Sequence, residues 1–365
     1  MRIALFILAI LHGLIHLLGF VKAFGFAEVK AMTAHVSKPI GMLWAAAAAL
    51  LLVYGTLHMT NYKFAWLAGL VAAVVSQVLI FMFWSEAKFG TIPNVVILVA
   101  STASFGLYSF NKTVQKETHQ ILKNSVSIET IITENAVKAL PLPVQEWLRK
   151  SGAIGKPLMS VGKVTQRAEM KMSPDQKEWM PAAAVQYTRI DEPAFIWTVD
   201  VKMNDFIGFR GRDKFEHGKG EMLIRMNSLI NVVDERGEKL NEGTLQRYLG
   251  EMVWFPSLAL SPYVTWDQIS DTAARATMSY RGTQGSGTFF FNAEGDFTKF
   301  SAMRYRGNEA DSKREEWIMS VTDYKTFEGI KVPAIMNATW KLDNGDWTWL
   351  NLEVTDIRYD KNIGD

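Results

Sequence analysis

Four apolar segments in the first third of the sequence constrain the fold most strongly. Each approaches the roughly 20 residues that an α-helix needs to cross about 30 Å of hydrocarbon. The second and third carry no formal charge and have Trp or Tyr near their ends, as membrane-spanning helices commonly do. We expect four transmembrane helices, over about residues 3–21, 40–59, 64–84 and 93–110.

The first segment has an alternative explanation as a cleaved signal peptide. Arg2 precedes it and the apolar run extends to about Ala27, which resembles the charge and length pattern of a secretion signal. The apolar stretch is long, however, and two histidines, His12 and His16, interrupt it. We therefore expect a helix that stays in the membrane.

Composition separates this part from the rest of the chain. Residues 1–110 contain six basic and two acidic residues, whereas the remainder contains 33 basic and 35 acidic residues. The net charge of +2 gives no reason to expect a nucleic-acid partner, and the absence of cysteine excludes disulfides and thiolate ligands. The sequence predicts a four-helix transmembrane module over residues 1–110 and a domain of soluble composition after it.

The region after the last apolar segment has two parts. Residues 111–140 are polar with scattered Ile, Leu and Val, and we interpret them as a partly helical stalk or linker. A helix is then expected between Pro143 and Gly152. From about residue 160 the hydrophobic period becomes two, which is typical of strands. Residues 141–365 are therefore predicted to form an antiparallel β domain with a helical lid.

Alternation of apolar and polar residues identifies particular strands. Two segments, AFIWTVDVKMN and EWIMSVTDY, place apolar side chains at every second position. An Asn344-Gly345 pair between two such runs is a strong hairpin signal, and FNAEGDFTKF contains another turn. The residues predicted to share a face are Phe195, Trp197, Val199, Val201 and Met203 in the first segment, and Trp317, Met319 and Val321 in the second.

One predicted helix interrupts the strands. NEGTLQRYLGEMVWFPSLAL starts at a plausible N-cap, Asn241, and has Leu245, Leu249 and Met252 at helical spacing before Pro256 ends the pattern. We expect this helix to lie across the apolar face of the sheet.

The segment LQRYLGEMVWFPSLALSPYVTWDQISDTAARATMSYRGTQGSGTFFFNAEGDF resembles an uncharacterised bacterial family, a domain of unknown function that often follows membrane helices. The resemblance covers roughly residues 140–360. The order of strands, a helix ending in a Trp-Phe-Pro step and hairpins is also similar to the lipoprotein-carrier fold of LolA and LolB. In that fold a curled antiparallel sheet is closed by helices around an apolar cavity. HGLIHLLGFVKAFG and WSEAKFGTIPN resemble a four-helix module found with this domain.

These resemblances imply a fold class and a location. The fold class is four transmembrane helices followed by a LolA-like half-barrel closed by helices, in the bacterial inner (cytoplasmic) membrane. Basic residues in short loops usually stay in the cytoplasm, and the first and third loops hold four lysines against Arg2 and Lys63 at the opposite end. Lysines after the last span would reverse this balance, but charges that lead into a long domain count for less. The β domain is therefore predicted to lie outside the cytoplasm.

His12 and His16 share one face of the first apolar helix, with the spacing found in metal-binding helices. His58, the only other histidine in a predicted span, is expected about 12 Å from His12 along the membrane normal, at 1.5 Å per residue. No acidic residue lies in a span, so we predict no metal and no haem. The simplest interpretation is a pair of neutral imidazoles bonded to Ser, Thr or Gln77. A proton, quinone or ion role is the alternative, since intramembrane ionisable residues are functional candidates.

The sequence predicts no catalytic residue and no cofactor. Asp213, Glu216 and His217 lie close together in GRDKFEHGKGEM, but the flanking glycines indicate a turn tip, where a lone histidine is usually solvated. GTQGSG lacks the lysine and following helix of a phosphate-binding loop. A Gly-x-Ser-x-Gly nucleophile elbow is also missing from the sequence.

Tryptophan is the distinctive residue of the β domain. Ordinary core packing is one explanation for it. The alternative is a cavity lined by large apolar side chains that receives a lipid-like ligand. On that hypothesis Trp197 and Trp317 are wall residues, Trp254 and Phe255 belong to a lid, and Trp266 also contacts the ligand.

Three functions follow from these alternatives. The leading one is non-catalytic binding or transfer of a lipid-like or apolar ligand by a membrane-anchored protein, with membrane lipid as its partner; it predicts an open cavity of several hundred Å³. A membrane sensor or assembly subunit that binds an envelope protein predicts a filled core and an exposed apolar patch. An enzyme acting on lipid or envelope substrates, the weaker option, predicts polar groups that converge in a pocket.

Overall fold

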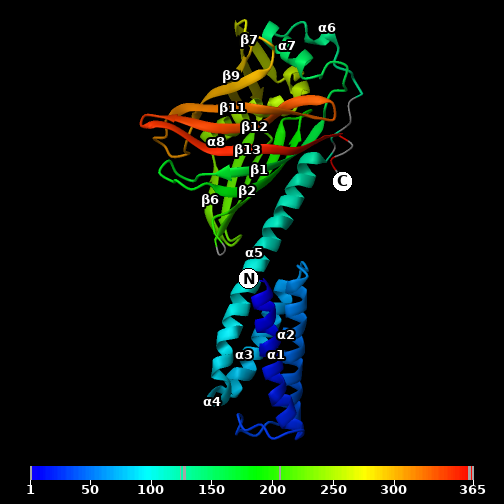
Figure 1. The fold of residues 1–365 in the computed structure, drawn as a ribbon, viewed down its shortest axis with the longest axis vertical. Helices are drawn as coiled ribbons and strands as arrows, with labels where there is room; N and C mark the ends of the chain where they lie inside the picture. Colours follow the sequence, from blue (N-terminus) through cyan, green and yellow to red (C-terminus); the bar gives the residue numbers. More distant parts are fainter. Residues whose placement is uncertain (1, 124, 126–128, 205–206, 361–362, 364–365) are drawn as a thin grey trace. The chain divides into compact units, whose positions relative to one another are not determined.

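The computed structural model describes residues 2–123, 125, 129–204, 207–360 and 363 (Figure 1). The chain forms two compact units, Met1–Lys112 and Thr113–Asp365. Part of the predicted stalk, residues 124 and 126–128, lies outside the described residues.

The first unit consists of helices, as expected from its apolar segments. Four of the helices in the described part of the chain are long and apolar enough to cross a membrane. The fourth predicted span belongs to a helix that continues beyond residue 110. The elements are α1 (Arg2–Phe24), α2 (Lys38–Met59), α3 (Ala65–Met82), the short α4 (Trp84–Ala87) and η1 (Lys88–Gly90), and α5 (Thr91–Leu122).

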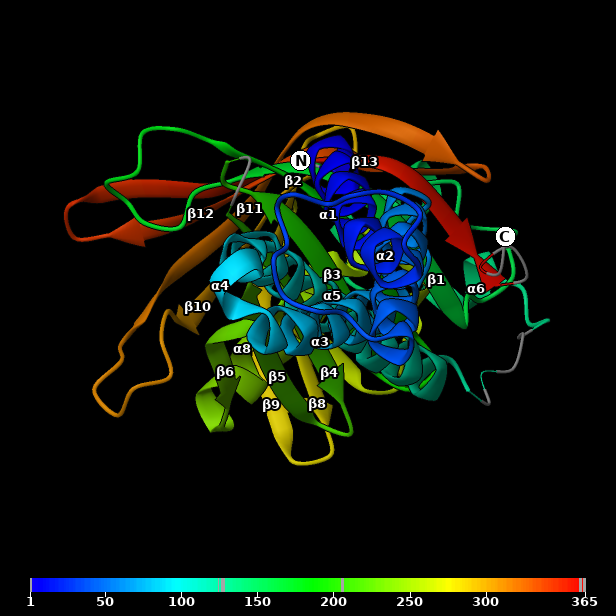
Figure 2. The ribbon, with the colours of Figure 1, turned by 90° about the horizontal axis from the view of Figure 1, so that it is seen from below.

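Small residues bring these helices close together. Gly19 packs against the Trp44 ring and Gly69 lies against Tyr54 and Ser101, where an added Cβ would come within 2.8 Å of the neighbouring atoms. Viewed along their length, α1, α2, α3 and α5 form one bundle (Figure 2). Large apolar side chains cover its outer surface. Small residues at helix contacts and apolar residues outside are typical of membrane helices, so the unit is compatible with a membrane location.

The second unit is built on one antiparallel sheet, as the alternating pattern predicts. In the described residues this sheet has thirteen strands. The strands are β1 (Val161–Met170), β2 (Met180–Arg189), β3 (Ala194–Lys202), β4 (Gly208–Glu216), β5 (Lys219–Met226), β6 (Ile230–Arg236), β7 (Val264–Ser270), β8 (Ala273–Tyr280), β9 (Thr283–Phe291), β10 (Phe297–Tyr305), β11 (Arg314–Phe327), β12 (Ile330–Leu342) and β13 (Gly345–Tyr359).

The strand order divides the sheet into two arms. It runs β6-β5-β4-β3-β2-β1-β13-β12-β11-β10-β9-β8-β7, so the first arm is β1–β6 and the second arm is β7–β13. The arms join where β1 pairs with β13, with Gly162 opposite Tyr359 at one end of the ladder. Strands β6 and β7 are the two free edges. The sheet is therefore large and not closed by strand pairing.

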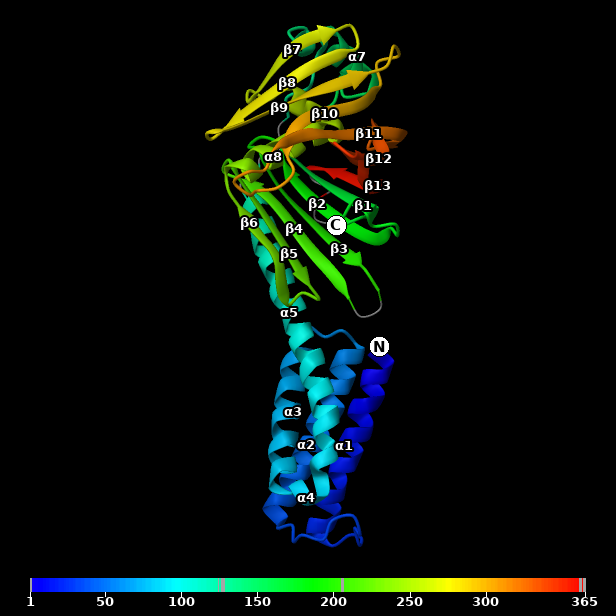
Figure 3. The ribbon, with the colours of Figure 1, turned by 90° about the vertical axis from the view of Figure 1, so that its left-hand side faces the viewer.

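Helix α8 (Glu238–Gly250) connects the two arms through space as well as in sequence. It contacts β4, β5 and β6 on the first arm and β8, β9 and β10 on the second. The sheet must curl to bring both arms to one helix, and Figure 3 shows the strands changing direction around it. The remaining helical elements of this unit are α6 (Glu134–Val137), α7 (Leu142–Lys150), η2 (Glu251–Trp254) and η3 (Pro256–Leu260).

Two local predictions were wrong. Helix α8 starts at Glu238, with Gly237 as N-cap, rather than at Asn241. The Asn241 side chain instead accepts a hydrogen bond of 2.7 Å from the Gly220 amide, which connects the helix to β5. Met203 does not share the buried face of β3, because the strand ends at Lys202 and leaves Met203 about half exposed.

The hairpins and the shared faces follow the prediction. Leu342 pairs with Gly345 across the predicted turn, and β9 and β10 flank the FNAEGDF turn. The predicted helix between Pro143 and Gly152 is α7. One extended apolar core packs between the sheet and its helices. It contains, from the predicted faces, Phe195, Trp197, Val199, Val201, Trp317 and Met319, with Val321 partly buried against it.

Candidate functional site

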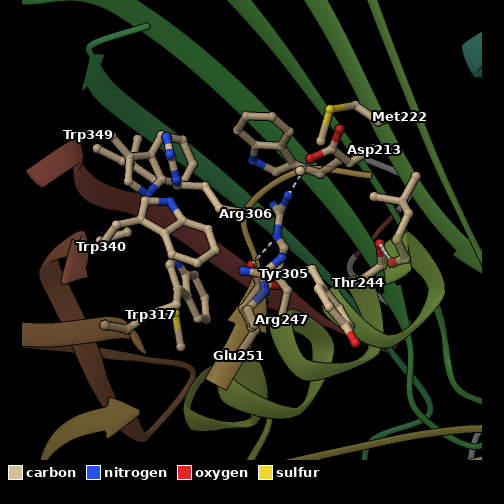
Figure 4. Close-up of a pocket in the computed structure, with 18 of the residues that line it drawn as sticks. Asp213, Met222, Thr244, Arg247, Glu251, Tyr305, Arg306, Trp317, Trp340 and Trp349 are labelled. Atoms are coloured by element: carbon tan, nitrogen blue, oxygen red, sulfur yellow. Dashed lines mark hydrogen bonds and ion pairs between the residues drawn. The ribbon is translucent and has the colours of Figure 1, made fainter. Parts of the chain in front are cut away.

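A cavity of about 420 Å³ lies between the curled sheet and α8 (Figure 4). Both arms of the sheet contribute to its wall, together with α8 and η2. Large aromatic residues and a group of charged side chains line it. The aromatic lining includes Trp197, Trp254, Trp317, Trp340, Trp347 and Trp349.

Four of these residues, Trp317, Trp340, Trp347 and Trp349, form what we call the tryptophan wall. They come from neighbouring strands of the second arm. Trp317 on β11 pairs in register with Trp340 on β12, which pairs with Trp347 on β13. Cross-strand partners project from the same face of a sheet, so the ring systems lie side by side. Figure 4 shows Trp317, Trp340 and Trp349 together on one side of the cavity.

A buried ionic cluster lies on the other side of the cavity. Arg247 of α8 places its Nη1 2.7 Å from Asp213 Oδ2 and its Nε 2.8 Å from Glu251 Oε1. Its Nη2 also donates to Gln186 Oε1 at 3.2 Å. Gln186 Nε2 donates to Glu251 Oε2 at 2.7 Å. The cluster therefore links α8 and η2 to β4 and β2.

Burial and neighbouring charges shift the pKa values of Arg247 and Asp213 in opposite directions. Burial by itself lowers the pKa of the Arg247 guanidinium, but the carboxylates of Glu251 and Asp213 reverse this effect and raise the pKa. Burial raises the pKa of Asp213, although Arg247 opposes the rise. The Arg247 guanidinium also lies over the Trp197 ring, 4.6 Å from its centroid. Both carboxylates are thus bound by one cation, which is typical of a structural network.

Arg304 of β10 is a second cation in the cavity lining, and it has a different environment. Its guanidinium lies over the Trp317 ring at 4.3 Å and near the Trp340 ring at 5.7 Å. Its Nε is buried and has no hydrogen-bond partner among the described residues. Burial, followed by the charge of Arg247, lowers its pKa to about 10. The carboxylates of Asp213 and Glu251 oppose this decrease, but neither forms an ion pair with Arg304 among the described residues.

The tryptophan wall adds further unpaired donors. The Nε1 atoms of Trp317, Trp347 and Trp349 are buried and have no acceptor within the described part of the structure. By contrast, Trp197 Nε1 donates to Gln166 Oε1 at 3.0 Å. Buried polar groups are normally hydrogen-bonded, so each exception needs an explanation.

The structure brings together three of the five residues predicted to bind a ligand. Trp197, Trp254 and Trp317 line the cavity. Phe255 lies outside the cavity lining and packs against Tyr359 and Gly162. Trp266 also lies outside it, where its ring packs on Phe289 and its Nε1 donates to the Ala259 carbonyl. Whether any of the five binds a ligand stays a prediction.

The predicted polar residues of the helical unit are connected by hydrogen bonds. His12 Nε2 lies 2.9 Å from Asn94 Oδ1 and 3.2 Å from Ser76 Oγ. Asn94 Nδ2 donates to Gln77 Oε1 at 3.0 Å. His16 Nδ1 donates to the His12 carbonyl at 2.9 Å, while its Nε2 is buried without a partner in the described chain. The network joins α1, α3 and α5, and its role also stays a prediction.

The turn around His217 follows the prediction for the histidine but not for Asp213. Asp213 lies within β4 and faces the cavity instead of occupying the turn tip. His217 is at the tip, with a positive φ of 53° and a side chain that is 65% exposed. Among the residues that the structure describes, no three His, Asp or Glu side chains are placed to hold a metal.

Sequence reasoning missed the charged side of the cavity. Arg247, Asp213, Glu251 and Arg304 were not predicted as site residues. For Arg304 a signal was present, because it continues the buried alternation of Phe300 and Ala302 along β10. A charged residue in the apolar register of a strand indicates a buried polar site, since charges are rarely buried without a reason.

Comparison with known proteins identifies the family. The fold and the cavity define a β domain with a tryptophan-rich pocket. Residues 130–352, more than half of the chain, match the model of a family of unknown function, DUF6544, and the chain belongs to this family. The predicted resemblance to an uncharacterised family is therefore confirmed.

Structural comparison finds similarity to a LolA superfamily protein from Nitrosomonas europaea. The two chains are 11% identical with a TM-score of 0.35, over 60% of this chain and 93% of that one. Comparison with curated proteins finds no match.

Proposed function

We propose that this protein is a membrane-anchored binding protein whose β domain holds one lipid-like ligand. The observation that carries the proposal is the cavity of about 420 Å³ with six tryptophans in its lining. Ligand pockets are typically about 300–1,000 Å³, mostly apolar, with a few placed polar groups. A volume at the lower end of that range favours a single apolar chain over a complete two-chain lipid.

The apolar chain supplies the binding free energy in this proposal. Each buried methylene contributes about 0.8 kcal/mol, and apolar lining residues such as Met319, Met336 and Leu352 provide a surface for it. The four apolar helices would hold the domain at a membrane, where such molecules are concentrated. The bacterial inner membrane and a domain outside the cytoplasm are part of the same proposal, supported by the distribution of basic residues in the loops.

The two other functions have weaker support. A protein-binding domain was expected to have a filled core, whereas this domain contains a cavity. An enzyme was expected to have converging polar groups, and the cavity does contain them. However, Asp213 and Glu251 both bind Arg247 at 2.7 and 2.8 Å, so neither carboxylate is free to act as an acid or base.

The test is ligand binding by the full-length protein in lipid nanodiscs. ω-Bromodecanol, a soluble probe with a bromine atom that quenches tryptophan fluorescence, should quench the wild-type protein saturably, above the background of empty nanodiscs. Ala338→Phe fills the cavity from β12 and should remove the saturable component, since Ala338 lines the cavity and is 3% exposed. Leu352→Phe is a second variant of the same design.

The matched control is Ala183→Phe. Ala183 is exposed on the outer face of β2 and is not part of the cavity lining, so this variant should bind like the wild type. Melting temperatures of the variants show whether they remain folded. Equal quenching of the wild-type, cavity-filled and control proteins would refute the proposal.

A further inference from the structure

We infer that the ligand carries an oxyanion, a carboxylate or a phosphate, which binds Arg304 and the indole N–H groups of the tryptophan wall. This inference rests on the proposed function, because it concerns the ligand of the same cavity. It goes beyond that function by naming the polar group of the ligand and the residues that recognise it.

The first observation is that Arg304 differs from the other cations of the cavity. Arg247 binds two carboxylates, and Arg306 is paired with Glu315 at 3.0 Å. Lys239 donates to backbone carbonyls, including that of Ala310 at 2.9 Å. Arg304 contacts aromatic rings instead, and its buried Nε has no acceptor among the described residues.

The second observation is independent of Arg304 and concerns the indoles. Trp317 is only 3% exposed, and its Nε1 has no partner within the described chain, as is also true of Trp347 and Trp349. Arginine and tryptophan side chains are donors only. The described residues supply no acceptor for these four N–H groups, so a ligand with acceptor atoms would satisfy them.

The third observation is the separation of charge within the cavity. The unpaired donors come from β10, β11 and β13, which belong to one run of four adjacent strands that also includes β12. The acidic lining residues come from other elements, β4, β5, β6, η2 and the segment after β10. They are Asp213, Glu221, Glu235, Glu251 and Glu309.

Most of these acids already have partners. Asp213 and Glu251 bind Arg247, Glu221 lies 3.0 Å from Arg212, and Glu309 accepts from Ser312. Figure 4 shows Asp213 across the cavity from Trp317 and Trp340. One side of the cavity is thus an ionic network that is largely complete. The other side holds donors without a hydrogen-bond acceptor among the described residues, although the charges of Asp213 and Glu251 also act on Arg304.

An oxyanion satisfies this set of donors better than a neutral group can. A guanidinium binds carboxylate or phosphate oxygens through two parallel hydrogen bonds, and indole N–H groups can donate to the remaining lone pairs. A neutral alcohol offers one oxygen and no charge. Hydrogen bonds to charged groups contribute about 1.5–3 kcal/mol, which corresponds to roughly a tenfold to hundredfold preference for an anionic ligand at 1.4 kcal/mol per factor of ten.

The experiment compares anionic and neutral probes on the full-length protein in nanodiscs. ω-Bromodecanoate should quench tryptophan fluorescence at a concentration roughly ten to a hundred times lower than ω-bromodecanol. Arg304→Met should remove this preference, so that the two probes quench at similar concentrations. Trp317→Phe, which keeps the aromatic ring and removes one N–H, should reduce the preference in part.

Matched controls test whether the effect belongs to these residues. Arg314 also stacks on an aromatic ring, that of Tyr305 at 4.4 Å, but it is paired with Glu242 and does not line the cavity. Arg314→Met should therefore keep the full preference. Trp266→Phe removes an indole N–H outside the cavity and should also keep it. Should Arg304→Met fail to fold, Arg304→Lys retains the charge without the planar fork and should give an intermediate preference.

The outcomes distinguish a failure of the oxyanion site from a failure of the proposed ligand-binding function. Saturable binding of both probes with equal affinity, or a preference that survives in Arg304→Met, would overturn the oxyanion site and leave the proposed function standing. Failure of both probes to bind would overturn the proposed function itself. Competition by decyl phosphate and by decanoate then distinguishes a phosphate from a carboxylate, whereas stronger competition by decyltrimethylammonium would contradict an anionic ligand.

Discussion

The ionic cluster around Arg247 gives a quantitative prediction about stability. We consider Arg247→Met, which keeps the length and apolar character of the side chain and removes its charge. The substitution leaves Asp213 and Glu251 without their common cation, and Gln186 loses one donor. Two buried carboxylates would then lie close together without their ion-pair partner, and the charges of Arg212 and Arg304 would offset this only in part for Asp213.

The geometry sets the size of the effect. The side chains of Arg247, Asp213 and Glu251 are 15%, 19% and 7% exposed, so solvent screens their interactions weakly. Removing one partner from a buried ion pair costs about 3–5 kcal/mol. For a domain of this size one kcal/mol corresponds to about 2–4 °C in melting temperature, so we expect a decrease of roughly 6–20 °C.

The effect should depend on pH in a direction fixed by Asp213. Burial raises the pKa of this carboxyl in the folded protein, and Arg247 limits the rise. Without Arg247 the pKa of Asp213 rises further above its value in the unfolded chain. The buried carboxyl then destabilises the folded protein when it ionises, so the free energy of unfolding decreases as the pH increases through the folded pKa. The deficit of Arg247→Met should therefore be larger near neutral pH than at about pH 5.

The measurement is thermal unfolding of the full-length protein in nanodiscs, followed by tryptophan fluorescence at both pH values. Arg314→Met is the control, because its ion pair with Glu242 is more exposed and is worth less than about 1 kcal/mol. Adding Asp213→Asn and Glu251→Gln to Arg247→Met should recover more than half of the lost stability. A decrease no greater than that of the control, or no recovery in the triple variant, would refute the reasoning.

Two further predictions concern other parts of the chain. Asn94→Leu removes the acceptor of His12 in the helical unit and should lower stability in mixed-micelle unfolding by about 0.6–1.7 kcal/mol. Thr102→Val, which removes only a bond within α5, should have a smaller effect, and equal losses would show that the His12 network is not stabilising. Gly162→Ala places a Cβ 2.1 Å from Phe255 Cε1 and should cost about 1–3 kcal/mol by overpacking. Phe255→Leu in the same chain should restore part of this loss in a thermal melt, and no restoration would exclude the clash as its cause.

The sequence predicted those parts of the fold that depend on local patterns. Hydrophobic length identified the four helices, and alternation with turn residues such as Asn344-Gly345 identified the β12–β13 hairpin. The start of α8 was misplaced because Asn241 has the chemistry of an N-cap, while its side chain forms a tertiary hydrogen bond to Gly220. A local signal cannot distinguish a cap from a partner on a distant strand.

For a related reason, the sequence predicted a tryptophan-lined cavity but not the full set of residues that line it. The alternation predicts that such a tryptophan faces the covered side of the sheet. It does not predict whether the indole ring contacts another side chain or lines a cavity. Trp266 and Trp317 have similar sequence surroundings, yet only Trp317 lines the cavity. The partners of Arg247 come from β2, β4 and η2, and their convergence depends on the curl of the sheet around α8, which no single segment encodes.

The position of β1 beside β13 has a consequence for how the domain is made. Nearly all of the β domain separates these strands in sequence, yet they are neighbours at the junction of the arms. During synthesis each arm can form from consecutive hairpins, but β1 has no partner on that side until β13 has emerged from the ribosome. This single ladder of high contact order should set the folding rate, and until it forms, a nascent chain displays an unpaired strand edge that invites association with other chains.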